Sequence, residues 1–503
     1  MTSTERRANY LAVDLGAESG RVHLGAFDGE RFDVHEVHRF PNTPVQLPDG
    51  LHWNLLRIYS DMLEGVRKAA REDDAGFDGI GIDSWAVDYG LLDASGALLG
   101  EPYHYRDART EGMVELAESL VPREEIYRTT GIQFMPINTM PQLLSERGSV
   151  RQTAAETFLM IPDLLNYWLT GRKVCERTNA TSTQLYDLGA ETWGRGLMER
   201  LGIPTHLFPD IVPPGEQLGP VCGPAAESLG FGSSLPVIAV ASHDTASAVV
   251  AVPAWDDDFA YISSGTWSLV GLELPAPVLT PEAMEANFTN EGGFGGTVRF
   301  LKNVMGLWLL QECRRTWAAA SRSYSYDELA AAAEVSPAFG ALVDPDDPAF
   351  LSPGDMPARI TVYCRDTGRR PPEGVGEVVR CVFDSLALKY RWVLERAEQL
   401  SGRRASVVHV VGGGSQNALL CRLTASATRR PVLAGPAEAA ALGNLLVQAQ
   451  SGGRIAGLDE MRAVSRRSTD LVRYEPEGTD DEWEQAYARF TEVLAVANGV
   501  RGG

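Results

Sequence analysis

The chain has 503 residues, of which 44% are hydrophobic and 22% are charged, the composition of an ordinary soluble globular protein. At roughly 150 residues per domain, this length predicts two or more domains, with cores large enough to need no metal or disulfide support. The formal net charge of −22 repels nucleic acid phosphates and anionic membrane surfaces, and it therefore argues against both as partners.

The N-terminal segment, MTSTERRANY, lacks the apolar core of a signal peptide, and no run of about 18 apolar residues occurs in the chain. These features predict a cytoplasmic protein without a transmembrane helix. None of the six cysteines forms a C-x-x-C pair, which argues against a zinc site. Free thiols are expected in the cytoplasm, although Cys364 and Cys381 could in principle form a disulfide.

The first half of the chain begins with a predicted β-hairpin at residues 10–28, where two apolar runs flank the turn GAESG. Residues 80–93, IGIDSWAVDYGLLD, repeat this pattern and predict a second hairpin. Residues 111–235 have a mostly helical pattern, with predicted loops at PINTMPQ and FPDIVPPGEQLGP. Residues 237–251, VIAVASHDTASAVVA, predict a strand, a tight turn and a helix.

A domain boundary is predicted in the polar segment VPAWDDD, residues 252–258. Directly after it, residues 259–273 predict a hairpin around Ser-Gly-Thr. This hairpin weakly repeats the one that opens the chain, and the repeat suggests two related lobes.

Three further segments of the second half have clear patterns. FLKNVMGLWLLQECRR predicts a helix, VVHVVGGGSQNALLCRL predicts a strand, a glycine loop and a helix, and DDEWEQAYARFTEVLAVA predicts a closing amphipathic helix. Strands, glycine turns and helices thus alternate in both halves, which predicts an α/β protein. The hairpins favour mixed sheets over purely parallel ones.

The turn DLGAESGR, residues 14–21, has features of a phosphate-binding turn. Gly16 and Gly20 allow a tight turn in which successive N–H groups point at an anion, and Arg21 is a bidentate partner for phosphate. Asp14 could hold a water of a hydrated magnesium ion. Glu18 would have to point away from the anion, and a plain hairpin turn explains the octapeptide equally well.

Two other turns have phosphate-binding features. In SSGTWS, residues 263–268, Thr266 could contact a phosphate, although a Ser/Gly hairpin is the commoner structure for such a segment alone. VVGGGSQN, residues 410–417, fails the dinucleotide-binding pattern because of Asn417, and it lacks the lysine of a P-loop. Its three glycines would offer a flat backbone surface to a nucleotide, or would only permit a tight crossover from strand to helix.

Asp244 follows a predicted buried strand directly. A lone aspartate at a strand end is more often a helix N-cap than a catalyst. Here the neighbouring His243 and the apolar approach predict a partly dry pocket, the setting that a general base requires. A histidine in the position of His243 is more often a packed or hydrogen-bonding residue than a second base. Phosphoryl transfer to a sugar hydroxyl needs little beyond such a base, positioning and charge neutralisation.

Taken together, DLGAESGR, SHDTASAV, SSGTWSLVG and VVGGGSQNALL resemble the phosphate, catalytic and adenosine motifs of the FGGY carbohydrate kinases. Supporting segments occur in the expected order between Leu11 and the region of Gln448: GIDSWAVDYGLLD, YRDART, GIQFMPINT, TNATSTQLYD, NFTNEGG and LKNVMGLWLLQE. The resemblance implies an α/β, two-lobed actin-like or ribonuclease-H-like fold with mixed sheets and ATP in the cleft between the lobes. It assigns residues 1–252 to an N-terminal sugar-binding and phosphate-turn domain and residues 253–503 to a C-terminal ATP-binding domain.

The same resemblance implies roles for individual residues. Asp244 would accept the proton, and Asp14 and Asp83 are candidates to position Mg²⁺ through water. The ketose would be contacted by Ala86, His243, Asp244 and Thr245. The ATP site would comprise Ala17, Glu18, Ser19, Gly20, Arg21, Thr266, Asn303, Gln311 and Gly413.

Two residues depart from the family pattern. Glu18 stands where a small hydroxyl residue is common, which leaves the role of its own side chain open. Ala86 stands where glycine is common, and its methyl group could reduce the sugar pocket. The second departure bears on which sugar is bound.

The activity implied by the resemblance is the transfer of a phosphoryl group from ATP, with Mg²⁺, to O1 of L-rhamnulose in L-rhamnose breakdown, by a monomer or homodimer. A related kinase of L-fuculose, xylulose or glycerol is the first alternative. Two others are a non-catalytic actin-like ATP switch, akin to the nucleotide domain of a heat-shock chaperone, and a sugar sensor that binds a ketose without forming ADP.

Overall fold

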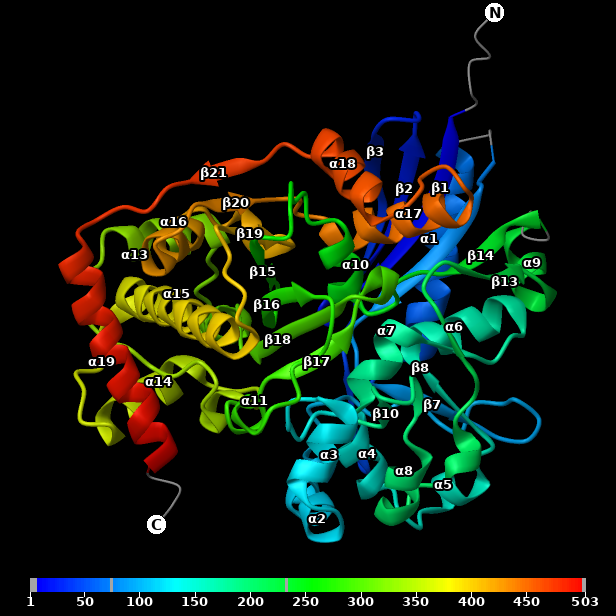
Figure 1. Ribbon diagram of the computed structural model, residues 1–503, viewed down its shortest axis with the longest axis horizontal. Helices are drawn as coiled ribbons and strands as arrows, with labels where there is room; N and C mark the ends of the chain where they lie inside the picture. The colour runs from blue at the N-terminus through cyan, green and yellow to red at the C-terminus, as the bar shows by residue number, and fades with distance from the viewer. Residues whose placement is uncertain (1–6, 73–75, 231–233, 500–503) are drawn as a thin grey trace, which may run out of the picture. The chain divides into compact units, whose positions relative to one another are not determined.

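The computed structural model describes residues 7–72, 76–230 and 234–499, and it confirms the predicted α/β class (Figure 1). The chain divides by its contacts into two compact units. Unit 1 comprises Met1–Trp255, Glu273–Phe300 and Glu438–Asp470; unit 2 comprises Asp256–Leu272, Leu301–Ala437 and Leu471–Gly503. The chain first passes from unit 1 to unit 2 between Trp255 and Asp256, inside the segment 252–258 that was predicted as a domain boundary. The assignment of 1–252 and 253–503 as domains stays a prediction.

Unit 1 is built around a six-stranded mixed sheet with the strand order β13-β14-β6-β1-β2-β3. The strands are β1 (Ala8–Leu15), β2 (Ser19–Phe27), β3 (Phe32–Pro41), β6 (Gly79–Ser84), β13 (Glu216–Pro220) and β14 (Pro236–Ala239). The central strands β14, β6 and β1 are parallel, and β13, β2 and β3 are antiparallel to their neighbours. Every residue of β1 and β6 is buried, as expected for parallel strands covered on both faces.

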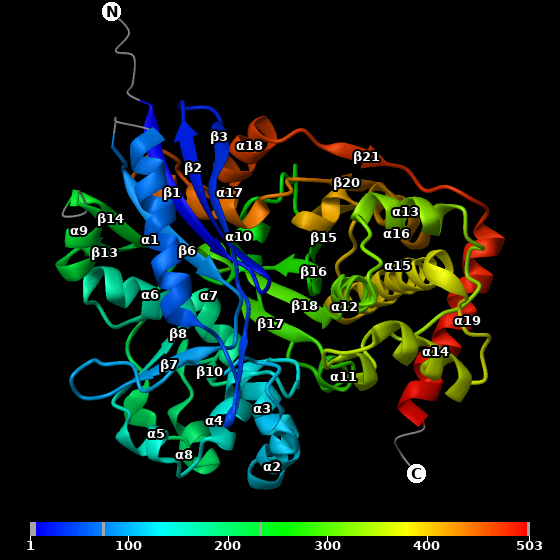
Figure 2. The same cartoon turned by 180° about the vertical axis from the view of Figure 1, so that it is seen from behind.

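Helices cover both faces of this sheet. Helix α1 (Leu55–Glu72) contacts β2 and β3, whereas α17 (Ala439–Ser451) contacts β1 and β6. Figures 1 and 2, which view the molecule from opposite sides, show them on opposite faces of the sheet. Helix α17 comes from a part of the chain more than 350 residues beyond β6, so it packs on the sheet only after the chain returns from unit 2.

The rest of unit 1 is mostly helical with short strand pairs. The helices are α2 (Met113–Leu120), α3 (Arg123–Thr130), α4 (Thr139–Ser145), α5 (Val150–Ala154), α6 (Ile161–Thr170), α7 (Arg177–Ala180), α8 (Arg195–Leu201), α9 (Gly223–Leu229), α10 (Asp244–Val250), α11 (Pro281–Glu285) and α18 (Leu458–Ser468). The strand pairs are β4 (Val45–Leu47) with β5 (Gly50–His52), β7 (Tyr89–Leu92) with β8 (Thr157–Met160), β9 (Cys175–Glu176) with β12 (Ile211–Val212), and β10 (Tyr186–Asp187) with β11 (Thr192–Trp193).

A second sheet has seven strands in the order β17-β18-β16-β15-β19-β20-β21. They are β15 (Phe259–Ser264), β16 (Ser268–Leu274), β17 (Thr289–Gly292), β18 (Val298–Val304), β19 (Val407–Val411), β20 (Val432–Ala434) and β21 (Val472–Tyr474). Strand β19 is parallel to both β15 and β20, whereas the β15–β16 and β20–β21 pairs are antiparallel, so this sheet is also mixed.

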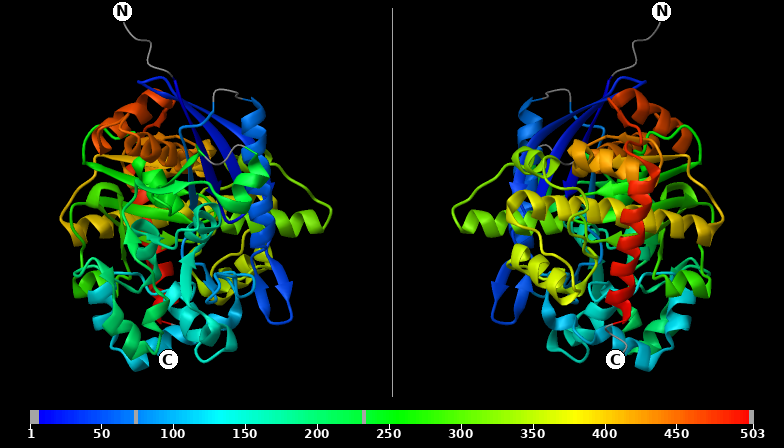
Figure 3. Two further views of the ribbon diagram at one scale, coloured as in Figure 1. Left: turned by 90° about the vertical axis from the view of Figure 1, so that its right-hand side faces the viewer. Right: turned by 90° about the vertical axis from the view of Figure 1, so that its left-hand side faces the viewer.

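The helices of unit 2 are α12 (Trp308–Ala319), α13 (Tyr326–Glu334), α14 (Met356–Asp366), α15 (Gly374–Ser401), α16 (Ala418–Thr428) and α19 (Asp480–Gly499). The long helix α15 packs against α13 and α16, and α19 crosses it (Figure 3). Single 3₁₀ turns are η1 (Ala108–Thr110), η2 (Thr181–Thr183), η3 (Thr205–Leu207), η5 (Phe294–Gly296), η6 (Pro348–Phe350) and η7 (Gly413–Gln416).

Several sequence-based elements are confirmed. The hairpins at 10–28 and 259–273 are β1–β2 and β15–β16, and residues 237–251 form β14, a turn and α10. The glycine loop lies between β19 and α16, and the closing helix is α19. All six cysteines are free thiols, and no helix among the described residues is long and apolar enough to cross a bilayer.

The predicted hairpin at 80–93 is wrong. β6 pairs in parallel with β1 and β14, whereas β7 pairs with β8 outside the six-stranded sheet. A parallel strand takes its partners from distant parts of the chain, so the short segment between two apolar runs is not evidence of a hairpin.

Three other boundaries were misjudged. The predicted loop PINTMPQ includes the start of α4, whose Pro141 lies in the first turn, where a missing N–H costs no helical bond. FPDIVPPGEQLGP contains β12 and the edge strand β13. FLKNVMGLWLLQECRR is not one helix, because its first five residues belong to β18 and α12 begins only at Trp308. Short apolar runs fit a strand and a buried helix equally well.

Candidate active site

Three aspartates lie at the carboxyl ends of neighbouring strands in unit 1. Asp14 in β1 is the register partner of Asp83 in β6. Asp244 is the first residue of α10, the helix that follows β14. The segment just before Asp244 is hydrogen-bonded to the end of β6: the N–H of Ser84 donates to the carbonyl of Ser242 at 2.9 Å. Since β14, β6 and β1 are adjacent, the three carboxylates share the edge at which α/β sheets bind ligands.

The carboxylates of this edge are crowded and partly dry. Asp83 is fully buried, and its Oδ2 accepts a 2.7 Å hydrogen bond from Asn444 of α17, whereas its Oδ1 has no hydrogen-bond partner among the described residues. Burial raises the pKa of Asp83 well above its usual value, and the charge of Asp14 adds to that effect. A cation at this edge would favour the ionised form of Asp83.

Asp244 is more accessible than Asp83, with 31% of its side-chain surface exposed. Burial raises the pKa of Asp244, the nearby Asp14 raises it further, and His243 opposes both. The N-cap position of α10 is occupied by His243, so Asp244 does not serve as the helix N-cap that was its alternative role.

The other predicted ketose contacts lie beside Asp244. Thr245 is buried and donates to Asp244 Oδ1 from its N–H at 2.6 Å. His243 pairs with Ser84 in an isolated parallel bridge, and the half-buried Ala86 follows two residues after Ser84. The structure therefore brings the predicted base and the predicted sugar contacts to one edge of the sheet.

The ring of His243 is buried and surrounded by charged groups. Its Nε2 lies 3.4 Å from Asp244 Oδ1, and its Nδ1 lies 3.1 Å from an Nη of Arg299 and 3.3 Å from Glu291 Oε2. Glu291 belongs to the quoted segment NFTNEGG, but neither it nor Arg299 was predicted to act at the site, because both come from the region of β17 and β18 rather than from α10.

The predicted phosphate turn, residues 14–21, is tightly held by hydrogen bonds. Gly16 N–H donates to the carbonyl of Ser19 at 3.0 Å, and the Asn42 side chain donates to the carbonyl of Gly16 at 2.9 Å. A Cβ on Gly20 would lie 2.3 Å from the ring of Phe40, so packing alone requires this glycine. Glu18 is the exposed residue of the turn, and Gly16, Ala17 and Ser19 are partly exposed.

Arg21 lies between two carboxylates, with one Nη 3.1 Å from Asp14 Oδ2 and 3.1 Å from Glu438 Oε2. It thus offsets negative charge at the carboxylate edge. Its predicted contact with phosphate stays a prediction.

A second group of metal-ligand residue types, His23, Glu36 and Glu438, lies next to Arg21. Both glutamates already pair with arginines, Glu36 with Arg39 and Glu438 with Arg21. Because these guanidinium groups compensate the carboxylate charge, the group fits an arginine–carboxylate network better than a cation site.

The predicted nucleotide contacts Thr266, Asn303, Gln311 and Gly413 all belong to unit 2. Thr266 lies in the turn between β15 and β16, and this turn accepts two backbone hydrogen bonds, from Leu307 to Gly265 at 3.1 Å and from Trp308 to Thr266 at 3.0 Å. These bonds hold the turn against the segment that joins β18, which contains Asn303, to α12, which contains Gln311.

The triple-glycine loop also packs against this region of unit 2. Gly412 has a φ of 81°, which favours glycine, and a Cβ on Gly414 would lie 2.0 Å from Ser264 Oγ. The tight crossover therefore accounts for two of the three glycines. Gly413 alone is exposed, and a Cβ there would meet nothing within 4 Å. It is the glycine that the resemblance assigns to the nucleotide.

Asp88 is a buried polar centre that the sequence analysis did not assign. Its Oδ2 accepts hydrogen bonds from the indoles of Trp53 at 2.6 Å and Trp85 at 2.9 Å, and its Oδ1 accepts one from Gln142 at 2.9 Å. Burial raises the pKa of Asp88 to about 6. Because Trp85 immediately precedes Ala86, this centre fixes the backbone next to a predicted sugar contact.

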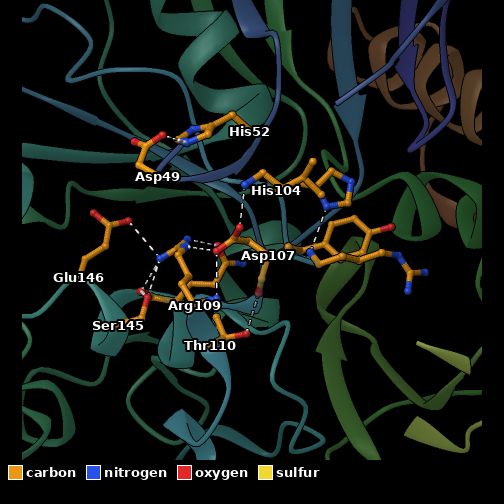
Figure 4. A network of polar contacts seen from close by, with 12 residues as sticks. Asp49, His52, His104, Asp107, Arg109, Thr110, Ser145 and Glu146 are labelled. Carbon is orange, nitrogen blue, oxygen red and sulfur yellow. Dashed lines mark hydrogen bonds and ion pairs between the residues drawn. The ribbon is translucent and has the colours of Figure 1, made fainter. Parts of the chain in front are cut away.

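Arg109 of the segment YRDART supports the same centre, and Figure 4 shows its guanidinium beside Ser145 and Glu146. Its guanidinium donates to the Gln142 carbonyl at 2.8 Å, to Gln142 Oε1 at 2.7 Å and to Ser145 Oγ at 2.7 Å, and it lies 3.3 Å from Glu146. Arg109 therefore orients Gln142, which in turn donates to Asp88. The segment SWAVDY, in which Trp85 stands three residues before Asp88, was the available sequence signal for this centre.

Curated relatives match nearly the whole chain. A protein named rhamnulokinase from Bacteroides thetaiotaomicron is 43% identical over 486 residues, which cover 96% of this chain and 99% of the relative. A second protein of that name, from Enterococcus faecalis, is 43% identical over 489 residues, covering 96% and 97% of the two chains.

Solved structures share the fold at low sequence identity. A xylulose kinase from Rhodospirillum rubrum has a TM-score of 0.78 at 20% identity, covering 98% of this chain and 99% of its own. A gluconate kinase from Lactobacillus acidophilus has a TM-score of 0.77 at 17% identity, covering 99% and 98%. These likenesses confirm the predicted fold class.

Two family matches together account for most of the sequence. The N-terminal domain of the FGGY family of carbohydrate kinases matches residues 9–251, and the C-terminal domain of the same family matches residues 260–451. The matched residues include all the segments on which the resemblance was based. The chain belongs to the FGGY family of carbohydrate kinases.

Proposed function

We propose that this chain transfers the γ-phosphoryl group of ATP to O1 of L-rhamnulose, giving L-rhamnulose 1-phosphate and ADP. The observation that carries the proposal is the 43% identity to rhamnulokinases over 96% of the chain, since family membership alone leaves the sugar open. The clustering of Asp244, His243, Thr245 and Ala86 at one sheet edge supports it. With ATP and a free sugar as substrates, we expect the reaction to take place in the cytoplasm.

In the proposed reaction Asp244 accepts the O1 proton. As that proton leaves, O1 forms a bond to the γ-phosphorus and the bond from this phosphorus to the bridging oxygen of ADP breaks. Such a base works best when its pKa is not far below the working pH, and burial raises the pKa of Asp244 in that direction. The exposed third of its side chain leaves room for a hydroxyl to approach.

Mg²⁺ is part of this proposal, and the carboxylate edge fits a hydrated ion. Asp83 Oδ1 is buried without a hydrogen-bond partner among the described residues, and Asp14 is its neighbour in register. Asp14 and Asp83 would hold the ion through its water molecules, and the ion would neutralise charge on the phosphate oxygens. Ala17 to Arg21 in unit 1 and Thr266, Asn303, Gln311 and Gly413 in unit 2 are the proposed ATP contacts.

The test is ADP release from ATP and Mg²⁺ with L-rhamnulose, L-fuculose, D-xylulose and glycerol, each with the wild-type protein and the Asp244→Asn variant. We expect the fastest turnover with L-rhamnulose and a loss of about 10²–10⁴-fold in the variant, the usual contribution of a positioned base. Equal or faster turnover with one of the other three compounds would assign that compound as the substrate in place of L-rhamnulose. No sugar-dependent ADP release would refute the kinase activity.

ATP affinity, measured by equilibrium binding to the same two proteins, is the control for this test. Asp244→Asn keeps the size of the side chain and removes its charge and its ability to take a proton, and Asp244 is not among the proposed ATP contacts, so ATP should bind both proteins alike. A variant that no longer binds ATP would point to a structural role for Asp244 instead.

A further inference from the structure

The tautomer of His243 decides what its Nε2 can do next to Asp244. A neutral imidazole carries its proton on one nitrogen, which donates, while the other nitrogen accepts. Nε2 is the nitrogen that faces Asp244 Oδ1, at 3.4 Å, and Nδ1 is the one that faces away, toward Arg299 and Glu291. Whatever contacts Nδ1 therefore determines whether Nε2 donates or accepts.

Arg299 is held rigidly against Nδ1. Its side chain is completely buried, its Nε donates to the carbonyl of Gly292 at 3.0 Å, and one Nη lies 3.1 Å from His243 Nδ1. A guanidinium group has five N–H donors and no acceptor, and it stays protonated in proteins. The Arg299–His243 hydrogen bond therefore requires an unprotonated Nδ1.

Glu291 favours the opposite tautomer but is less well placed to enforce it. Its Oε2 is 3.3 Å from Nδ1, farther than the Arg299 Nη at 3.1 Å. The same oxygen lies 3.1 Å from the other Nη of Arg299. Although burial alone would raise it, the pKa of Glu291 is lowered by the charge of Arg299 and by His243. Glu291 is thus an ionised partner that stabilises the buried guanidinium.

We infer that Arg299 is a positioning residue that keeps the proton of neutral His243 on Nε2. A protonated Nδ1 would face a guanidinium N–H at 3.1 Å, so the Arg299 contact disfavours the other tautomer. Nε2–H can then donate to Asp244 or to an acceptor oxygen of the sugar, but it cannot take a proton. Asp244 is left as the only proton acceptor of the pair.

The first test reads the tautomer directly and needs no activity. The full-length protein, labelled with ¹⁵N in its histidine rings, is examined by long-range ¹H–¹⁵N spectra at pH 7.5, and the His243 signals are identified by their loss in His243→Ala. We expect a protonated Nε2 and an unprotonated Nδ1. A protonated Nδ1, alone or with a protonated Nε2, would overturn the inference.

The second test removes the donor. In Arg299→Met, Nδ1 can donate to Glu291, so the proton should move to Nδ1 and Nε2 should become an acceptor. In Arg299→Lys, which retains a donor, we expect the wild-type tautomer at least in part. A His243 spectrum that is the same in wild type and Arg299→Met would show that Arg299 does not set the tautomer.

The kinetic consequence rests on the proposed function. Arg299→Met should lower kcat/KM for the ketose by about tenfold or more, the usual cost of leaving a buried polar group wrongly paired, and leave KM for ATP within about twofold. In a His243→Ala background, Arg299→Met should lower kcat/KM by no more than about twofold further, because its effect passes through the ring. A full additional loss there would mean that Arg299 acts only through general stability.

These outcomes are separable from those of the proposed function. If the wild-type protein releases no ADP with any sugar, the proposed function fails while the ring spectra still decide the tautomer. If Arg299→Met does not fold, Glu291→Gln is the second variant, since it removes the competing carboxylate but keeps the arginine. It should retain the protonated Nε2, and a change to the other tautomer would overturn the inference.

Discussion

Gly443 of α17 lies against the backbone of α10, the helix that begins at Asp244. A Cβ on Gly443 would be 1.8 Å from the carbonyl oxygen of Ser247 and 2.5 Å from its carbon. Ordinary contacts begin at 3.4 Å, so Gly443→Ala forces these two helices apart by about 1.6 Å. Neither contacting group is a flexible side-chain end that could rotate away.

The expected effect on activity is large because both helices carry residues of the candidate site. α10 starts with Asp244, and the residue after Gly443 is Asn444, which donates to Asp83 at 2.7 Å. A displacement of about 1 Å in a reacting group can cost about 100-fold in rate, so we expect kcat to fall by about that factor. Overpacking costs about 1–3 kcal/mol, of which the better helix propensity of alanine offsets up to about 1 kcal/mol.

The assay compares ADP release and thermal unfolding of wild type, Gly443→Ala and a matched control, Gly196→Ala. Gly196 lies in α8, and a Cβ there would meet nothing within 4 Å. The control should keep the wild-type kcat and unfold at the same or a slightly higher temperature, whereas Gly443→Ala should lose both activity and stability. If Gly443→Ala behaves like the control, the close approach of α10 and α17 is not required, and the reasoning is refuted.

Three further predictions concern titration and the glycine loop. In a pH–rate profile, the apparent pKa at which kcat/KM for the ketose falls in acid should be above the ordinary aspartate value of about 3.9, because burial and Asp14 raise the pKa of Asp244. An apparent pKa at or below that value would contradict this prediction. Burial raises the pKa of Asp88 to about 6. Above that pH the ionised carboxyl lowers the free energy of unfolding by up to about 3 kcal/mol, and this cost disappears as the pH falls toward 4, because the carboxyl is then protonated in both the folded and the unfolded state. Any stability advantage of Asp88→Asn over wild type should therefore shrink between pH 7 and pH 4, and a difference in unfolding free energy that stays constant would contradict it. Gly414→Ala should lower the unfolding temperature because its methyl group would meet Ser264, whereas Gly413→Ala should keep it and raise KM for ATP; equal unfolding temperatures would contradict the packing argument.

Local elements were predictable where the signal lies within a short stretch of chain. The turns GAESG and Ser-Gly-Thr join antiparallel neighbours, so β1–β2 and β15–β16 could be found from their own residues. The segment from β6 to β7 has a similar pattern, but β6 is paired with β1 and β14, and the hairpin prediction failed there. Nothing in residues 80–93 specifies the partners of Ile80, which are Leu11, 69 residues before it, and Val237, 157 residues after it.

The candidate site was predicted in part for the same reason. Asp244 and the turn after β1 could be singled out because each comes within a few residues of the end of an apolar run. For Gly20 and Gly414 the sequence left two interpretations open, a backbone surface for a phosphate or nucleotide and a plain turn or crossover, and the structure shows that packing against Phe40 and Ser264 requires both glycines. The sequence cannot separate these two uses of glycine, since the neighbouring ring or hydroxyl comes from another element.

The sequence by itself determined the family, the α/β class and the strand-end position of Asp244, since all of these follow from residues adjacent in the chain. Only the tertiary structure decided that Asp14 and Asp83 are register partners, that Asn444 donates to Asp83, and that Arg299 contacts His243. The two hydrogen bonds join residues that are 361 and 56 positions apart in the chain. Such contacts exist because burial forces each polar group to find a partner, and the fold alone determines which group is within reach.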